Sequence, residues 1–230
     1  MRAPPELLEP ALAAVLPLLD TGRPRLIVGV AGPPGAGKST LAAGLAAAVT
    51  VRTGVSAVDV AMDGFHLANA ELERLGLADR KGAPPTFDGY GFVHLLRRLR
   101  AADPDDVVYA PTFSRVLNES VGSAVPVPPD VRVVVVEGNY LLLPEPPWSD
   151  VRELLDVALY VDADAATRYR ALLRRHRAGG RDEAQAHDWV VRNDEANARL
   201  IAGTRDRADL VLCRTGVRPN PAGGGGAAAG

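Results

Sequence analysis

Residues 32–39 read Gly-Pro-Pro-Gly-Ala-Gly-Lys-Ser and fill every fixed position of the pattern G-x-x-x-x-G-K-[ST]. An apolar run at 26–31 precedes this loop, and a helix-forming run at 40–46 follows it. A strand, a glycine-rich loop and a helix in this order bind phosphate, because backbone N–H groups and the helix N-terminus point at one anion. The loop therefore predicts a site for ATP and Mg²⁺, in which the lysine reaches the β- and γ-phosphates and the serine hydroxyl binds the metal. The predicted nucleotide-binding residues are Gly32, Gly35, Ala36, Gly37, Lys38, Ser39 and Thr40.

Lysine is rare in this chain, which has 26 lysines and arginines together but only two lysines, Lys38 and Lys81. Lysine carries a compact charge on a flexible stem, whereas arginine presents a planar fork. A lysine in a chain that uses arginine almost everywhere indicates a site that needs the compact charge. Lys38 in the glycine-rich loop fits that interpretation, and Lys81 is a second candidate.

The composition is that of an ordinary globular protein, with 47% hydrophobic and 23% charged residues over 230 positions. A formal net charge of −2 gives no electrostatic reason to expect a nucleic-acid partner or an anionic membrane. The sequence has no run of 18 apolar residues that could span a bilayer. The single cysteine, Cys213, excludes an internal disulfide and suits a reducing compartment. We therefore expect a cytoplasmic protein whose partner is a small molecule.

We expect three segments along the chain. Residues 1–24 contain an apolar stretch interrupted by acids and prolines, which predicts a helix packed on the domain rather than a signal peptide. Residues 25–215 are expected to form the main domain. The glycine- and alanine-rich residues 216–230 are expected to be a disordered tail.

Within the main domain, apolar strand-like runs alternate with helical patterns. This alternation predicts an α/β fold with a doubly wound, mostly parallel sheet of about five core strands and helices on both faces. Ligands of such sheets bind beyond the carboxyl ends of the strands. Two irregular segments, 76–89 and 112–130, are long enough to be functional loops, and the second is a candidate hairpin outside the main sheet. The predicted strands are 25–31, 55–61, 106–111, 131–136, 156–161 and 208–213. The predicted helices are 5–19, 38–50, 66–75, 90–102, 164–178 and 182–202.

Two acids follow predicted strands and are expected to face the glycine-rich loop. Asp63 follows the second strand, where a carboxylate can accept the proton of a reacting hydroxyl. The alternative for Asp63 is a helix N-cap, a role that aspartate often has. Glu137 follows four consecutive valines, and a buried acid at that place is costly unless it has a partner such as Mg²⁺. We expect Ser39 and Glu137 to hold the metal.

A basic segment and a second loop complete the predicted site. Residues 168–181 contain six arginines and the pair Gly179-Gly180, which predicts a lid at about 170–185 that supplies charge to phosphate. The alternative is a solvated basic face in a chain rich in arginine. The loop 80–88 combines positive charge, glycine and an aromatic residue, which suits a small acceptor substrate. The predicted acceptor-binding residues are His66, Arg80, Lys81 and Tyr140.

Four segments together resemble the phosphoribulokinase/uridine kinase family of P-loop kinases, which includes type I pantothenate kinases. They are Asp63–His66, Arg80–Asp88, Glu137–Leu143 and Asn193–Ala198, and the similarity extends from about Arg25 to about Leu212. The pattern is most similar to that of bacterial nucleoside/nucleotide kinase family proteins, some of which are called fructose-transport-system kinases.

The resemblance implies ATP and Mg²⁺ on Lys38 and Ser39, an acid such as Asp63 as the base, and catalytic lid arginines near Arg174 and Arg181. It also implies a possible homodimer. One position departs from the family pattern, because Ser114 stands where relatives often carry an aspartate. If that aspartate contacts the acceptor in relatives, the acceptor of this chain differs from theirs.

The sequence thus predicts an ATP-dependent kinase that transfers the γ-phosphoryl group to a hydroxyl of a small metabolite, such as a nucleoside, a sugar or a pantothenate-like alcohol. A regulatory or chaperone-type NTPase, with no phosphorylated metabolite, is the alternative. The sequence has no N-K-x-D segment of the kind that reads guanine in such proteins. A binding module without turnover is a third alternative, and the presence of Ser39, Asp63 and Glu137 disfavours it.

Overall fold

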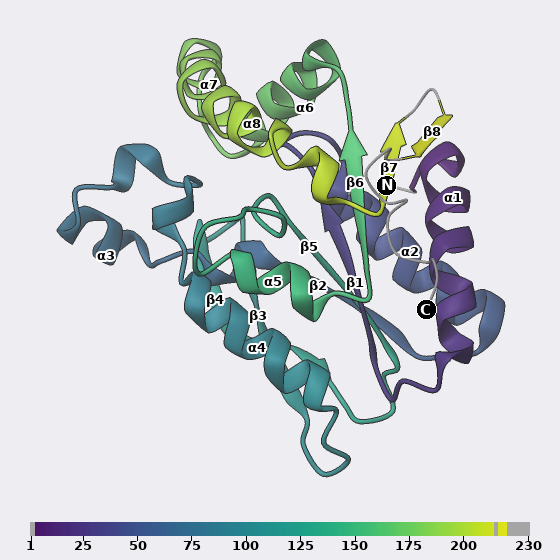
Figure 1. Ribbon diagram of the computed structural model, residues 1–230. Coiled ribbons are helices and arrows are strands. Elements are labelled where there is room, and N and C mark those ends of the chain that lie inside the picture. The colour runs from purple at the N-terminus through teal and green to yellow at the C-terminus, as the bar shows by residue number, and fades with distance from the viewer. Residues whose placement is uncertain (1–2, 214–215, 220–230) are drawn as a thin grey trace.

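The computed structural model of the protein describes residues 3–213 and 216–219. Its main sheet has six strands in the order β2-β5-β1-β6-β7-β8, and the first five are parallel (Figure 1). The predicted doubly wound parallel sheet is therefore confirmed, with β1 at its centre. The strands are β1 (Leu26–Ala31), β2 (Ala57–Ala61), β5 (Val133–Gly138), β6 (Val157–Asp162), β7 (Leu210–Cys213) and β8 (Gly216–Pro219).

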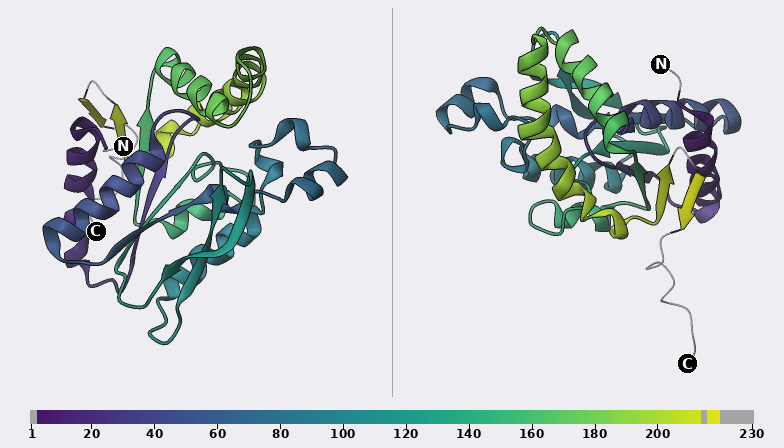
Figure 2. Two further views of the ribbon diagram at one scale, coloured as in Figure 1. Left: turned by 180° about the vertical axis from the view of Figure 1, so that it is seen from behind. Right: turned by 90° about the horizontal axis from the view of Figure 1, so that it is seen from above.

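Helices cover both faces of this sheet. The helix α1 (Pro5–Val15), continued by the 3-10 helix η1 (Leu16–Thr21), packs with α2 (Lys38–Thr53) on one face. The helices α4 (Gly89–Ala101) and α5 (Ser149–Leu154) pack on the other face (Figure 2). Each face therefore has its own buried cluster, and the apolar residues of β1 and β5 alternate between the two clusters.

The expected strand 106–111 begins at Val108 but does not join the main sheet. It forms β3 (Val108–Ser114), which pairs antiparallel with β4 (Glu119–Val127) in a separate two-stranded sheet. Burial along β3 and β4 is only partial, as expected for a hairpin with one solvated face. The hairpin expected within 112–130 is thus present, and its first strand includes residues that were expected to form a strand of the main sheet.

The segment predicted as one helix at 182–202 is interrupted. The helix α7 (Glu183–Trp189) runs into a π-helical turn, η5 (Val190–Asp194), and continues as α8 (Glu195–Ala202). The helix α6 (Ala165–Ala178) lies beside them at the carboxyl end of the sheet (Figure 1). Short helices complete the fold: η2 (Met62–Phe65), α3 (Asn69–Arg74), η3 (Ala78–Arg80), η4 (Pro84–Thr86) and η6 (Arg205–Arg207).

A buried arginine stabilises the amino end of the central strand, opposite the carboxyl end of the sheet. Arg25, directly before β1, is 2% exposed. Its guanidinium donates hydrogen bonds to the backbone carbonyl oxygens of Val131, Leu99 and Pro128, at 2.9, 3.2 and 3.0 Å. Because buried carbonyl groups need partners, one side chain here satisfies three of them.

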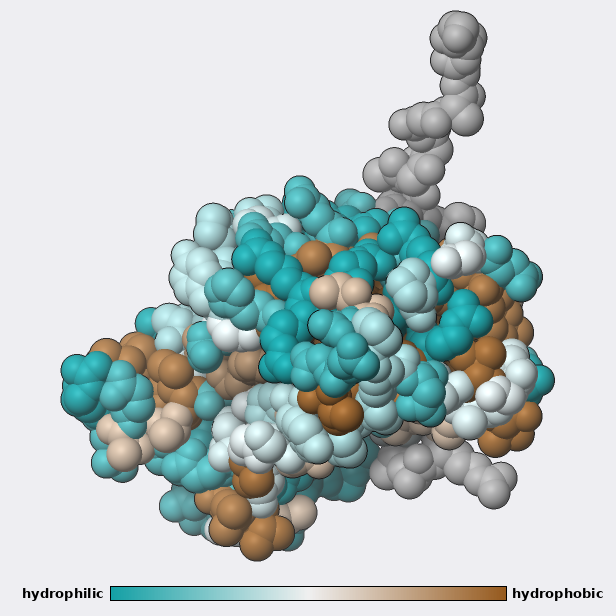
Figure 3. Space-filling view, turned by 90° about the horizontal axis from the view of Figure 1, so that it is seen from below, coloured by the Kyte–Doolittle hydropathy of each residue, from teal (hydrophilic) through white to brown (hydrophobic). Residues whose placement is uncertain are grey.

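The expectation of a disordered tail from position 216 is wrong for residues 216–219. Residues Gly216–Pro219 form β8, which pairs antiparallel with β7 at the edge of the sheet. The rest of the expected tail, 220–230, lies outside the described residues. In the described part of the chain, every helix is too short or too polar to cross a bilayer. Figure 3 shows apolar groups on one face separated by hydrophilic side chains.

Candidate active site

The loop after β1 packs tightly against the neighbouring strand and helix. A Cβ atom on Gly32 would lie 2.5 Å from the carbonyl oxygen of Val161 on β6, and one on Gly35 would lie 2.8 Å from that of Arg168 on α6. Both glycines have a positive φ, 146° and 79°, which residues with side chains rarely adopt. Glycine is therefore required at both positions. The loop backbone continues through Ala36 and leads into the first turn of α2, which contains Thr40.

Lys38 is the first residue of α2 and is buried, at 7% exposed. Its Nζ atom donates a hydrogen bond to the carbonyl oxygen of Pro33 at 3.1 Å, within the loop itself. Burial lowers the pKa of Lys38, and the charges of Glu137 and Asp63 act in the opposite direction. An ammonium group has three donors. One of them folds the loop, and the others suit phosphate oxygens.

Ser39 and Glu137 lie together at the ends of α2 and β5. The Ser39 hydroxyl donates a hydrogen bond to Oε1 of Glu137 at 2.8 Å. The strand register explains the contact, because Glu137 on β5 is paired with Val30 of β1, just before the loop. Hydroxyl and carboxylate oxygens are hard ligands of the kind that Mg²⁺ prefers. The described residues contain no cluster of three or more His, Cys, Asp or Glu side chains suited to a metal. A site with two protein oxygens fits Mg²⁺, which keeps several waters and binds substrate phosphates.

Glu137 is strongly perturbed. Burial and, secondly, the negative charge of Asp63 raise the pKa of its carboxyl group to about 7, against the opposing effects of Lys38 and the Ser39 hydrogen bond. The carboxylate is therefore costly to ionise until a cation arrives. Perturbed acids in a cleft are characteristic of functional sites.

Asp63 follows β2 directly and lies in η2, next to the Glu137 site. Its charge acts on Lys38, Glu137 and the phenol of Tyr140, so Asp63 lies near the loop and the end of β5. The residues that precede η2 and α3, Ala61 and Ala68, make no side-chain capping bond. The N-cap alternative for Asp63 is thus wrong.

His66 lies beside Asp63 within an aromatic wall. Its Nδ1 atom is 2.8 Å from the carbonyl oxygen of Asp63, and its ring lies 4.0 Å from that of Phe87 and 4.9 Å from that of Phe113. Burial lowers the pKa of His66, which favours the neutral imidazole. The hydrogen bond with a carbonyl then places the proton on Nδ1 and leaves Nε2 as an acceptor.

The loop 78–88 is held in place by several contacts, although its two basic residues differ. Lys81 Nζ donates to Oδ1 of Asn69 and to the carbonyl oxygen of Asn118 at 2.8 Å, so it fastens the loop to the turn between β3 and β4. Arg80 is exposed, and its side chain makes no hydrogen bond or ion pair within the described residues. The buried Tyr140 donates its hydroxyl hydrogen to the carbonyl oxygen of Gly82. Tyr140 is therefore a support of this loop.

The structure divides the predicted lid arginines. Arg174 is exposed on α6, and its side chain makes no hydrogen bond or ion pair within the described residues. Its neighbour Arg175 lies 3.4 Å from Oδ1 of Asp194, and its charge acts on both Lys38 and His66. Arg181 stacks on the ring of Trp189 at 4.0 Å from its centroid and lies beside His176. The charge of Arg175 thus reaches the phosphate loop, while the catalytic role of Arg174 stays a prediction.

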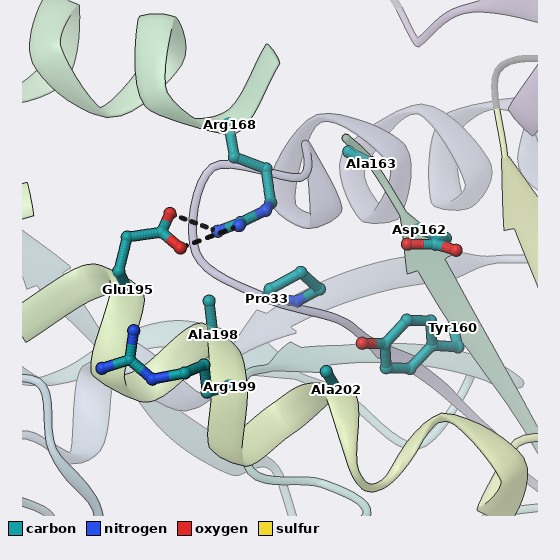
Figure 4. A pocket seen from close by; sticks show the side chains of 9 residues that line it. All are labelled: Pro33, Tyr160, Asp162, Ala163, Arg168, Glu195, Ala198, Arg199 and Ala202. Atoms are coloured by element: carbon teal, nitrogen blue, oxygen red, sulfur yellow. Dashed lines mark hydrogen bonds and ion pairs between the residues drawn. The ribbon is translucent and has the colours of Figure 1, made fainter. Parts of the chain in front are cut away.

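A second basic residue of α6 lies under the loop. Arg168 is 6% exposed, and its guanidinium pairs with Glu195 of α8, with Nη1 3.0 Å from Oε1 (Figure 4). The two side chains border a pocket of about 190 Å³ between α8, the end of β6 and Pro33 (Figure 4). Because a Cβ atom on Gly35 would lie only 2.8 Å from the carbonyl oxygen of Arg168, α6 packs closely on the phosphate loop.

Sequence reasoning missed four residues of this arrangement: Arg168, Arg175, Asp194 and Asn197. Both arginines belong to the basic run, but only their seven-residue spacing, about two helical turns, indicated a shared face. Asp194 and Asn197 belong to a segment used for the family resemblance, to which no role was given. Their roles depend on the π-helical turn, which the sequence pattern does not reveal.

The geometry defines a class of protein first. A glycine-rich loop between a central parallel strand and a helix, with acids at the carboxyl ends of the next two strands on one side of it, is the site of a P-loop nucleotide-binding protein. Residues 27–219 match the Phosphoribulokinase / Uridine kinase family, and the chain belongs to this family. It is an ATP-dependent kinase that phosphorylates a small metabolite.

Similar proteins differ in the substrates that their names give. A "putative fructose transport system kinase" from Silicibacter sp. TM1040, known from a crystal structure, is 40% identical with a TM-score of 0.81, covering 89% of this chain and 98% of that chain. "Putative uridine kinase C227.14" from Schizosaccharomyces pombe is 36% identical over 195 residues, 82% of this chain and 83% of that protein. A pantothenate kinase from Limosilactobacillus reuteri is 32% identical over 220 residues, 85% of this chain and 71% of that protein.

Proposed function

We propose that this kinase transfers the γ-phosphoryl group of Mg²⁺-bound ATP to a hydroxyl group of a nucleoside, a sugar or a pantothenate-like alcohol, with Asp63 as the base. The observation that carries this proposal is the position of Asp63. Its carboxylate acts electrostatically on Lys38 and Glu137 and caps no helix. A carboxylate beside the phosphate site is suited to accept the proton of the attacking hydroxyl.

The other residues have roles that follow from their contacts. Lys38 and the glycine-rich loop bind the phosphates, and Ser39 with Glu137 fits Mg²⁺. The metal, when bound, neutralises charge on the transferring phosphoryl group. Arg175 extends positive charge toward the same place from α6, where charge that develops in the transition state is stabilised.

The acceptor site lies between η2, the loop 78–88 and the β3–β4 hairpin. Its aromatic wall, His66 with Phe87 and Phe113, suits the apolar face of a ring or a short carbon chain. The neutral Nε2 atom of His66 is suited to accept a hydrogen bond from an acceptor hydroxyl. Ser114 at the hairpin end accepts a hydrogen bond from the backbone N–H of Leu117, so it adds no charge to this wall. The names of the relatives, which include uridine and pantothenate kinases, support a hydroxyl-bearing metabolite.

The test compares the wild type with Asp63→Asn and a surface control, Asp20→Asn. ADP formation is measured with a panel of nucleosides, ketohexoses and vitamin alcohols, and phosphorylated products are identified by ³¹P NMR. We expect Asp63→Asn to lower acceptor-dependent turnover by roughly 10²–10⁴-fold, the usual range for a general base. ATP affinity should stay within about twofold, because the asparagine removes no phosphate contact, and Asp20→Asn should match the wild type.

Two results would contradict the proposal. Wild-type turnover in Asp63→Asn would remove the base assignment. Strong ATP hydrolysis that no acceptor in the panel stimulates would instead favour a regulatory NTPase, the alternative that the sequence left open.

A further inference from the structure

The segment Val190–Asn197 lies between the phosphate side and the acceptor side of the proposed site. It consists of the π-helical turn η5 and the first residues of α8, and it lies between α6 and the loop 78–88 (Figure 2). π-Helical turns are rare and occur often at functional sites. The mechanism above gives no role to Asn193, Asp194 or Asn197 of this segment.

Two amide side chains of the segment hold the loop 78–88. Asn193 Nδ2 donates to the carbonyl oxygen of Asp79 at 2.8 Å, and Asn197 Nδ2 donates to that of Gly82 at 3.1 Å. The two asparagines are four residues apart, so they lie on one side of the helical segment. The carbonyl of Gly82 also accepts the hydroxyl of Tyr140, which makes it a fixed point of the acceptor loop.

The residue between these asparagines, Asp194, contacts helix α6 on the opposite side of the segment. Asp194 is 6% exposed, and its Oδ2 atom lies 2.7 Å from Nε2 of the buried His176. Its Oδ1 atom lies 3.4 Å from the guanidinium of Arg175. The next residue, Glu195, pairs with Arg168 of the same helix α6. The segment therefore contacts α6 at two places and the acceptor loop at two places.

We propose that Asn193, Asp194 and Asn197 form a coupling unit, which positions Arg175 over the phosphate site and the loop 78–88 over the acceptor site through one rigid element. All three are positioning residues, since they act through Arg175 and through the loop backbone. The proposal rests on the proposed function for the roles of Arg175 and the loop. Because coupling between two sites is reciprocal, a change on the loop side must alter nucleotide binding, and nucleotide must order the loop.

The charge of Asp194 supports this role. It is a buried carboxylate between two cationic or ionisable partners, and its field reaches Lys38 and Tyr140. A buried carboxylate that lost its partners would be costly, so the side chains of α6 stay docked on the π-helical turn. A movement of α6 that carries Arg175 therefore moves the turn, and the turn carries both asparagines.

The experiment uses the Mg²⁺ complex of AMP-PNP as the nucleotide probe and needs no acceptor. Its affinity is measured by calorimetry, and hydrogen exchange of the backbone amides in 78–88 is measured with and without the probe. The proteins are the wild type, Asn193→Ala, Asp194→Asn and, as a matched surface control, Asp188→Asn. Asp188 is exposed on α7, where it pairs with Arg192.

We expect Asn193→Ala to weaken probe binding about fivefold, the effect of one net hydrogen bond, although it contacts only the loop. We expect the probe to slow exchange in 78–88 in the wild type and in Asp188→Asn, and this slowing to be largely lost in Asp194→Asn. Each of these results supports one direction of the coupling.

Unchanged probe affinity in Asn193→Ala, together with faster exchange in 78–88, would overturn the proposal, since the loop would then be held without any link to α6. Equal slowing by the probe in Asp194→Asn and the wild type would overturn it as well. If Asp194→Asn does not fold, the probe affinity of Asn193→Ala still tests the proposal, because Asn193 is only half-buried. Failure of the wild type to bind the probe would refute the proposed kinase function, whereas the exchange of 78–88 in probe-free Asp194→Asn would still report on the coupling.

Discussion

Replacement of Glu137 by glutamine should stabilise the nucleotide-free protein at neutral and alkaline pH. Glu137 is buried at the end of β5, where burial and the charge of Asp63 raise its pKa to about 7 from its ordinary value of 4.5. Glutamine has nearly the same shape and keeps an oxygen that can accept the Ser39 hydrogen bond. The substitution therefore removes the ionisation and little else.

The size of the effect follows from proton linkage. The folded state holds the Glu137 proton up to about pH 7, whereas the unfolded chain releases it near pH 4.5. Stability of the wild type therefore falls as pH rises through this window, and below it both states are protonated. The pKa of Glu137 differs by roughly 2.5 between the folded and unfolded states, and each pKa unit corresponds to about 1.36 kcal/mol. Its ionisation therefore lowers the free energy of unfolding by about 3 kcal/mol at pH 8 and by roughly 1.4 kcal/mol at pH 5.5. The variant should thus gain about 2 kcal/mol over the wild type between these two pH values.

Urea unfolding of both proteins at pH 5.5, 6, 7 and 8, without metal or nucleotide, measures this gain. Glu73→Gln, an exposed position on α3, serves as the control and should show no pH-dependent difference. A constant offset between Glu137→Gln and the wild type at all four pH values would refute the reasoning, because it would mean that Glu137 is ionised throughout. Glu137→Gln should also bind Mg²⁺ with nucleotide more weakly than the wild type. The substitution thus has opposite effects on the stability of the empty protein and on metal binding.

Three further variants probe the loop, the lid and the base of the fold. Arg175→Gln should lower kcat by roughly 10²-fold, the effect of one lost charge-stabilising donor, whereas Arg174→Gln should stay within about twofold in the same steady-state assay. Gly32→Ala should abolish binding of a fluorescent ATP analogue, because its Cβ would lie 2.5 Å from the carbonyl of Val161; normal affinity would show that the loop adapts. Arg25→Met should cost about 3–5 kcal/mol in urea unfolding, because three buried carbonyl groups lose their donor at 2.9–3.2 Å; a loss below about 1 kcal/mol would mean that water replaces it.

The sequence predicted the parts of the structure that depend on local pattern. The loop 32–39 follows a run of apolar residues and precedes a helix, and those neighbours alone indicated its place at the carboxyl end of β1. Glu137 and Asp63 follow strands, so parallel pairing with β1 and β5 brought both to the loop. In each case the information lies within about ten residues of the chain.

The misplaced features depend on contacts between distant segments. The residues of β3 resemble any short strand, and only their pairing with β4 decides that they leave the main sheet. Arg174 and Arg175 are adjacent in one basic run, and a rotation of about 100° on the helix separates the exposed Arg174 from Arg175, which pairs with Asp194. The π-helical turn η5 adds a residue to the helix without any glycine or proline to mark it. Asp194 is consequently visible in the sequence only as one more acid.

The separation of the two sheets has a consequence for how this protein can change. The six-stranded sheet carries the phosphate loop and both acids, while the β3–β4 hairpin, which forms one wall of the proposed acceptor site, shares no strand with it. Exchange of the hairpin between relatives therefore leaves the phosphoryl-donor half intact. Such a chimera would keep the same phosphate-binding site and gain specificity for a different acceptor, in nature or in the laboratory.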